Sequence, residues 1–461
     1  MNWSTSQANE AFRMYGRLLL PELQVLLSEN DNAGVKEFCE ALYPAVTAEI
    51  LAELESEKVW RVLSCCEAQK QAEIFQFLPL PQQIEIVGVI ERGPLSKLIE
   101  EMAPDDRVDL LTRMDDEHVE ELLPLIAQAE RSDIRKLLSY PEDSAGAIMT
   151  TEYASLPENI TVAQALERLR QQAPDSEIIS YIYVVDEGRR LQGIVSLREL
   201  IFARPARPLS EITNRDVISV RVDDDQEFVA QQMARFDFVA IPVVDHQNQL
   251  VGIVTHDDAI DIMQEEATED THRLAAVEPL EDSYLATPLK TVIQKRVGWL
   301  IFLLVPSFLA AKVLEHFEGV SDKFEWLVLF IPLILASGGN AGSQSATLII
   351  RAMALESNIQ RDELRALLRK ELQLGLLLGG MLSVISFLVS WMFTSQLMQA
   401  TVVGLAVFLV VLMGISAGGM LPMGFRKLGM DPALMSNPFI TALVDILGLI
   451  IYFQVAIYMI S

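Results

Sequence analysis

Five long apolar runs in the C-terminal part of the chain constrain the fold more than any other feature of the sequence. The chain has 461 residues, and the runs begin after residue 296. Each is long enough for a helix that spans the roughly 30 Å hydrocarbon core of a bilayer. They cover residues 297–317, 326–350, 372–393, 402–424 and 433–460. The sequence therefore predicts a multi-pass membrane domain of five helices.

The charges of the connecting loops predict the orientation of these helices. Lys290, Lys295 and Arg296 precede the first run, whereas the loop after it, "EHFEGVSDKFE", is net acidic. Basic residues return after the second and fourth runs, and the loop after the third run has no charge. Basic loops stay on the cytoplasmic side. We therefore expect a protein of the plasma (inner) membrane, with its first 290 residues in the cytoplasm and its C-terminus outside.

Acidic residues are concentrated ahead of the membrane domain. Of the 64 Asp and Glu residues, 54 lie within residues 1–290, and the whole chain has a formal net charge of -28. This sign argues against nucleic acid as a partner, because phosphates need positive side chains. Three segments are especially acidic: "PDDRVD" from Pro104, "DDDQE" from Asp223, and "HDDAIDIMQEEATED" from His256. A solvated acidic face would explain any one of them, but together they favour divalent-cation sites where domains meet.

The last apolar run contains a polar stripe. Asn437, Thr441 and Asp445 are spaced four residues apart, and Gly448 and Tyr452 continue the same helical face. Asp445 is the one acid near the middle of a run, and an ionisable group there costs a few kcal/mol or more. Water and a cation would accommodate it. In a C2 dimer, two such carboxylates facing one axis could hold hydrated Mg²⁺, an ion that tends to keep its waters.

The second run holds a cluster of small and polar residues, "GGNAGSQ", from Gly338 to Gln344. Small residues let membrane helices approach closely, which accounts for many of them. Asn340 and Gln344 are explained less well in this way, because lipid offers amides no partners. They favour a cavity or pore over simple helix packing.

Residues 141–265 contain an internal repeat. "VVDEGRRLQGIV" from Val184 and "VVDHQNQLVGIV" from Val243 are offset by 59 residues, and each reads as strand, polar turn, strand and helix start. This is similar to a pair of cystathionine-β-synthase (CBS) domains, which implies an α/β fold. Upstream, residues 20–140 show helical spacing interrupted by prolines, which indicates an all-α superhelical stack.

Together these features resemble the MgtE family of magnesium channels and transporters. The most specific segments are "GGNAGSQ", "EEATED" before the membrane domain, and "DPALMSNPFITALVD" leading into the last run. The resemblance implies four parts: a helical N domain (1–140), tandem CBS domains (141–265), an acidic linker or plug helix (266–292) and a five-helix transmembrane domain (293–461).

The family resemblance also implies roles for individual residues. It implies a homodimer with a pore for Mg²⁺ on the two-fold axis, where Asp445 matches the pore carboxylate, Asn437 and Thr441 match pore-lining positions, and Asp431 matches an acid at the cytoplasmic mouth. Bound intracellular Mg²⁺ would close this pore. The matching sensor positions are Asp105, Asp109, Asp225, Glu227, Asp237, Asp258, Glu266, Glu269 and Asp270. The CBS pair can also bind ATP, with Tyr181 and Arg198 at matching positions.

Other functions remain open from the sequence. The runner-up is a CBS-regulated transporter of another divalent cation, Co²⁺ or Mn²⁺, or a secondary transporter coupled to an ion gradient. An anion pathway should not present a lone carboxylate, and a nucleotide sensor without transport would leave the polar stripe unexplained. An enzyme is disfavoured, since no base–nucleophile pair or phosphate-binding loop is found.

Overall fold

The structure is a computed structural model of the chain. It describes residues 18–460, apart from 115–118, 120–122, 127, 173–175, 177, 281–283, 286, 356–360 and 429–436. The chain forms two compact units, Met1–Ile262 and Met263–Ser461.

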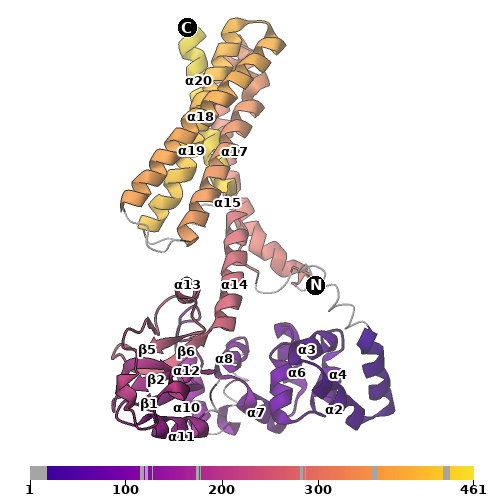
Figure 1. Cartoon of the computed structure of the whole chain (residues 1–461). Helices are drawn as coiled ribbons and strands as arrows, with labels where there is room; N and C mark the ends of the chain where they lie inside the picture. Colours follow the sequence, from indigo (N-terminus) through magenta and orange to yellow (C-terminus); the bar gives the residue numbers. More distant parts are fainter. Residues whose placement is uncertain are drawn as a thin grey trace. The chain divides into compact units, whose positions relative to one another are not determined.

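The first unit begins with short helices around one hydrophobic core (Figure 1). Prolines occupy the first or second position of three of them, where the missing N–H group leaves no intrahelical bond unmade. The all-α expectation for this region is confirmed. A helix over 18–29 is followed by α2 (Asn32–Ala41), α3 (Pro44–Leu51), α4 (Ser56–Leu63), α5 (Ala68–Phe75), α6 (Leu80–Val89), α7 (Arg92–Glu101), α8 (Pro104–Thr112), the 3-10 helix η1 (Leu123–Leu125) and α10 (Gln128–Leu137).

Two small mixed sheets follow, one for each copy of the repeat. The first has the order β1-β2-β3, in which β1 pairs parallel with β2, and β2 pairs antiparallel with β3. The second, β4-β5-β6, repeats this pattern. The elements are β1 (Tyr153–Pro157), α11 (Val162–Gln172), β2 (Ile178–Val185), β3 (Leu191–Ser196), α12 (Leu197–Phe202), η3 (Leu209–Glu211), β4 (Val220–Arg221), α13 (Gln226–Phe236), β5 (Ala240–Val244), β6 (Leu250–Thr255) and α14 (His256–Leu274).

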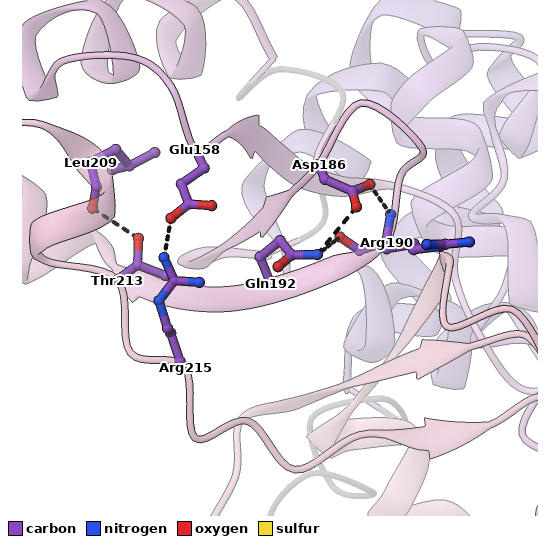
Figure 2. Close-up of polar contacts among 7 residues, drawn as sticks. All are labelled: Glu158, Asp186, Arg190, Gln192, Leu209, Thr213 and Arg215. Carbon is purple, nitrogen blue, oxygen red and sulfur yellow. Dashed lines mark hydrogen bonds and ion pairs between the residues drawn. The ribbon is translucent and has the colours of Figure 1, made fainter.

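The repeated aspartate of each copy organises the turn between its two antiparallel strands. Asp186 Oδ1 accepts hydrogen bonds from the backbone N–H groups of Gly188, at 2.8 Å, and Arg190, at 2.9 Å. Figure 2 shows Asp186 with Arg190 and Gln192, whose side-chain amide also contacts it. Asp245 makes the equivalent bonds to Gln247 and Gln249, both at 2.8 Å. The sequence repeat is therefore a repeat of turn chemistry as well as of strands.

The repeated glycine of the second copy marks a close approach of backbone. A Cβ atom on Gly252 would lie 2.9 Å from the carbonyl oxygen of Thr150, because Thr150 bridges the neighbouring Ile253 through two backbone hydrogen bonds. Asn214 pairs in the same way with Ile194 of β3, beside Gly193. Glycine leaves room for the segment that pairs with the outer strand of each sheet.

Among the described residues of the second unit, five helices are long and apolar enough to cross a membrane; Figure 1 shows these helices. They agree with the five predicted runs, and α18 begins well before its run, as described below. The helices of this unit are α15 (Leu289–His316), α16 (Glu318–Lys323), α17 (Trp326–Leu355), α18 (Arg361–Thr394), α19 (Leu397–Lys427) and α20 (Asn437–Ile460).

Helix α19 lies at the centre of this unit and packs against α17, α18 and α20. Its valines and alanines form a buried cluster with aromatic residues of α17 and α20, among them Phe330, Tyr452 and Phe453. Helix α15 differs from the others. No residue of its most apolar segment is buried, and it packs mainly against α20. The most buried helix is thus the one that the others pack around.

Facing glycines set the distance between α17 and α19. Gly338 and Gly342 of α17 lie against Gly414 and Gly418 of α19, so both helices contribute a pair of small residues four positions apart. A Cβ atom on Gly414 would lie 2.5 Å from the carbonyl oxygen of Gly338. The two backbones therefore touch, and no side chain fits between them.

We expect Gly414→Ala to destabilise the membrane unit by about 1–3 kcal/mol, the usual cost of overpacking a filled interface. The matched control is Gly424→Ala in the same helix, where an added Cβ meets nothing within 4 Å. Thermal unfolding of the detergent-solubilised protein measures the difference. Equal midpoints for the two variants would contradict the close contact.

Candidate functional site

The polar stripe of α20 lies against a second polar stripe on α17. The Ser343 hydroxyl of α17 is 3.0 Å from Thr441 Oγ1 and donates to the Asn437 carbonyl at 3.3 Å. One turn further, Thr347 Oγ1 donates to Asn437 Oδ1 at 3.2 Å. The predicted residues Asn437 and Thr441 are thus brought together with Ser343 and Thr347. Thr347 was missed because it lies outside the "GGNAGSQ" segment, although its four-residue spacing from Ser343 was a usable signal.

Asp445 lies two turns beyond Asn437 on α20. Its Oδ1 atom is buried and has no hydrogen-bond partner among the residues that the structure describes. Lys312, the one basic residue within the predicted runs that could have neutralised it, instead pairs with Glu315 at 2.5 Å. A buried carboxylate oxygen without a partner costs about 1–3 kcal/mol or more. Asp445 is therefore available to a cation or its hydration water.

The polar stripe is shorter than the sequence suggested. Tyr452 is fully buried in the apolar cluster of α17, α19 and α20, and its hydroxyl donates to the Leu327 carbonyl at 3.0 Å. Gly448 packs against Val410 and Leu335. Helical spacing alone cannot distinguish a residue that faces water from a core tyrosine whose hydroxyl is hydrogen-bonded to a backbone carbonyl. Asp431 lies outside the described residues.

A second acid of this unit was not anticipated from the sequence. Glu371 directly precedes the third predicted run, 372–393, but α18 begins at Arg361, and Glu371 is only 8% exposed. Its carboxyl is hydrogen-bonded to the Ser345 hydroxyl of α17, and its Cγ is 3.4 Å from the position of a Cβ on Gly419. Hydropathy does not indicate that Glu371 is buried, because the charged residues Arg369 and Lys370 directly precede it.

The acidic linker residues lie on α14. Glu269 forms an ion pair with Arg273 one turn on, and Glu266, Glu269 and Asp270 are all partly buried. The last residue of the helix, Leu274, packs against an apolar cluster of α17, α19 and α20 that includes Ile440 and Val444. The helix that carries these acids thus ends in contact with the helices of the polar stripe.

Carboxylates of α8 and α14 lie close together within the first unit. Burial, together with the charges of Asp109, Asp257 and Asp261, raises the pKa of Asp106 to about 6. Burial and the charges of Asp257 and Asp106 outweigh a hydrogen bond from Thr255, and they raise the pKa of Asp258 to about 6. These groups repel one another and resist ionisation, which is the environment that a divalent cation relieves.

The other predicted sensor residues lie on α8 and α13 and have several different surroundings. Asp105 is buried and Asp109 is exposed on α8, but Asp106, which was not predicted, is the one that faces α14. Asp225 caps the start of α13, Glu227 accepts from Gln231 at 3.0 Å, and Asp237 ends α13 with φ 54°. Within the described part of the chain, no three acidic, histidine or cysteine side chains are placed to hold one metal ion.

The two predicted ATP-binding positions lie at one end of the first sheet. Tyr181 of β2 pairs in register with Ser196, the residue that caps α12. Arg198 is exposed in the first turn of α12. An aromatic ring and an exposed guanidinium at one edge suit stacking on a base and contact with a phosphate.

Comparison with known protein families finds matches in three parts of the chain. Residues 331–455 match the MgtE divalent cation transporter family, residues 42–143 match the MgtE intracellular N domain, and residues 145–206 and 209–265 each match a CBS domain.

Two curated relatives match over nearly their whole length. The magnesium transporter MgtE of Thermus thermophilus is 40% identical over 442 residues, which are 95% of this chain and 98% of the relative. The Bacillus subtilis magnesium transporter MgtE is 32% identical over 96% of this chain and 97% of the relative.

A solved structure of similar fold is the cytosolic domain of the Mg²⁺ channel MgtE in complex with ATP. It is 40% identical with a TM-score of 0.51, and the match covers 53% of this chain and all of that one. The soluble part of a magnesium transporter is 33% identical with a TM-score of 0.52, over 55% of this chain and 99% of that one.

The candidate spans, the intracellular N domain and the CBS pair together define the class as a multi-pass membrane transporter. The chain belongs to the MgtE family of magnesium transporters. It is a membrane protein with an intracellular N domain, and it is not an enzyme.

The raised pKa values of Asp106 and Asp258 predict a pH-dependent stability. Below the unfolded-state pKa of about 4 both acids are protonated in either state. As the pH rises to about 6, ionisation costs more in the folded state, so the cytoplasmic unit loses stability and then levels off. Thermal unfolding of the full-length protein in Mg²⁺-free buffer measures this loss.

Asp106→Asn should recover about 1–3 kcal/mol at neutral pH, because the amide avoids ionisation. Asp223→Asn, at an exposed position, is the control and should change little. If wild type and Asp106→Asn have the same pH profile, the acids do not interact as described.

Proposed function

We propose that this protein takes up Mg²⁺ through a pore on the axis of a homodimer, and that intracellular Mg²⁺ closes the pore. One observation carries the proposal: Asp445, on the polar face of α20, has a buried oxygen with no partner among the described residues. In a domain that belongs to a magnesium transporter family, such an oxygen suits the passage of a cation.

We infer a dimer because one Asp445 carboxylate per chain is too little charge for a divalent-ion site. A single carboxylate is a weak site for a divalent ion, whereas two Asp445 side chains across an axis supply two charges. Mg²⁺ sheds water reluctantly, so these carboxylates would hold it through its hydration shell. Hydroxyls and amides lining the same path, from Asn437 and Thr441 with Ser343 beside them, would accept hydrogen bonds from those waters.

Electrostatic repulsion supplies the proposed gate. Each pair of like charges about 4 Å apart repels by about 1–4 kcal/mol, depending on the local dielectric. Mg²⁺ bound among the acids of α8, α13 and α14 would remove this repulsion and favour the compact, closed state. The proposed ligands are Asp105, Asp109, Asp225, Glu227, Asp237, Asp258, Glu266, Glu269 and Asp270, to which the geometry of α8 adds Asp106. Low internal Mg²⁺ would then release the linker helix from the pore mouth, where Asp431 is proposed to lie.

The remaining proposals concern the cytoplasmic part. ATP would bind the CBS pair at Tyr181 and Arg198. A cytosolic domain that is 40% identical to this chain and crystallised with ATP supports this proposal.

The proposed domains are the N domain over 1–140, the CBS pair over 141–265, the linker over 266–292 and the membrane domain over 293–461. Basic loops on one side favour cytoplasmic N-terminal domains and an external C-terminus in the inner membrane.

Asp445→Asn should lower the initial rate of Mg²⁺ influx into proteoliposomes by at least about tenfold, since a lost charge interaction of more than 1.4 kcal/mol has this effect. Asp322→Asn, an exposed acid of α16 in the same unit, is the matched control and should transport normally. Unchanged influx through Asp445→Asn would refute the pore assignment. Competition with Co²⁺ and Mn²⁺ in the same assay tests the runner-up, a transporter of another divalent cation.

Mg²⁺ should protect the linker helix from a glutamate-specific protease. We expect slower cleavage near Glu266 in millimolar Mg²⁺ than in chelator, because weak divalent sites fill in this range. Cleavage at Glu187, in the exposed turn of the first CBS copy, is the internal control and should not respond. Equal cleavage near Glu266 under both conditions would rule out the gate.

A further inference from the structure

The buried acid Glu371 connects three membrane helices. It belongs to α18, and its carboxyl is hydrogen-bonded to the Ser345 hydroxyl of α17. The same hydroxyl lies 3.2 Å from the Ile415 carbonyl oxygen of α19. Gly419 of α19 leaves the space that the Glu371 side chain occupies, with 3.4 Å between Glu371 Cγ and the position of an added Cβ. Glu371 is therefore held at the junction of α17, α18 and α19.

Glu371 has no cationic partner among the residues that the structure describes. Basic residues do occur on the elements packed around it, but none forms an ion pair with its carboxyl. They are Arg365, Arg369 and Lys370 on α18, Arg351 on α17, and Arg426 and Lys427 on α19. Within the described part of the chain, the hydrogen bond with Ser345 is the polar contact that holds this buried side chain.

Helix α17 links this junction to the polar stripe. Ser343 and Thr347 are four residues apart and share the face that contacts α20, whereas Ser345, two residues from each, lies roughly 200° around the helix. One side of α17 thus contacts Asn437 and Thr441, and the opposite side is held by Glu371. A rotation or shift of α17 would break both sets of bonds together.

We propose that Glu371 is a positioning residue for ion passage: through its hydrogen bond with Ser345 it fixes α17, and so holds Ser343 and Thr347 against the polar face of α20. It does not touch the ion. The inference rests on the proposed pore along α20, and it goes further by assigning a role to an acid outside that pore.

The first test compares a neutral isostere with a truncation in Mg²⁺ uptake by full-length protein in proteoliposomes. Glu371→Gln keeps a side chain of the same length that can hydrogen-bond with Ser345, and it should retain uptake within about twofold of wild type in both maximal rate and half-saturating Mg²⁺. Glu371→Ala and Ser345→Ala should each lower the maximal rate by about threefold to tenfold, the effect of losing one buried hydrogen bond. Their double variant should be no slower than either, because both changes break one unit.

Three results of this transport test would overturn the positioning role of Glu371. A Glu371→Gln variant as slow as Glu371→Ala would show that the charge of the acid is needed, not its hydrogen bond. Wild-type rates for Glu371→Ala would show that the junction has no effect on transport. Multiplied losses in the double variant would show that Glu371 and Ser345 act separately.

A second test does not depend on transport. Ser343→Cys with Thr441→Cys places two thiols where oxygens lie 3.0 Å apart, so oxidative cross-linking reports the α17–α20 contact. Glu371→Ala should slow this cross-linking severalfold and Glu371→Gln should not. The control pair is Phe317→Cys with Phe453→Cys, whose rings stack at 4.9 Å elsewhere in the unit. Loss of both cross-links would overturn positioning in favour of general loss of packing.

The two tests separate this inference from the pore itself. If Asp445→Asn transports normally, the pore assignment fails, yet the cross-linking result still decides whether Glu371 positions α17. If Asp445→Asn is inactive but cross-linking is independent of Glu371, the pore stands and the positioning role fails.

Discussion

The backbone contact between α17 and α19 is the constraint on which the membrane unit depends. Gly338 and Gly342 meet Gly414 and Gly418, and no side chain fits between the helices. This contact brings α17 close enough to α19 for Ser345 to reach the Ile415 carbonyl, and it turns the opposite face of α17 towards α20. Apolar helices gain little from burial in lipid, so close packing and hydrogen bonds must hold them together.

The polar residues of this unit therefore have two kinds of surroundings. Asn437, Thr441, Ser343 and Thr347 bond to one another along the α17–α20 contact, and Glu371 with Ser345 bonds across the α17–α18–α19 junction. Asp445 differs from all of these, because its buried oxygen has no partner among the described residues. We propose that the satisfied groups position the helices and that the unsatisfied Asp445 is the group that meets the ion.

The cytoplasmic unit uses the opposite principle, since it brings like charges together. Asp106 on α8 approaches the acids at the start of α14, and burial with mutual repulsion raises its pKa to about 6. Such a cluster costs stability at neutral pH, and a divalent cation would recover it. In the proposed gate, bound Mg²⁺ would restore this stability. The fold of the unit would then respond to the ion that the family transports.

Much of this could be read from the sequence, because the relevant signals are local. Run length and hydropathy predicted five spans, the offset of 59 residues predicted two CBS sheets with their turns, and proline breaks predicted the short helices. The stripe of Asn437, Thr441 and Asp445 followed from helical spacing alone. What hydropathy and spacing missed were residues whose surroundings come from other helices: Glu371, which reads as part of a charged loop, and Tyr452, which reads as part of the stripe.

The sequence by itself determined which segments cross the membrane, which segments pair into sheets, and which acids are available. The tertiary structure alone decided that Asp106 faces α14, that Tyr452 belongs to the core, and that Glu371 is buried against Ser345. The physical reason is that span length and strand pairing depend on neighbours along the chain. Burial, pKa and hydrogen-bond partners depend instead on atoms that only folding brings together.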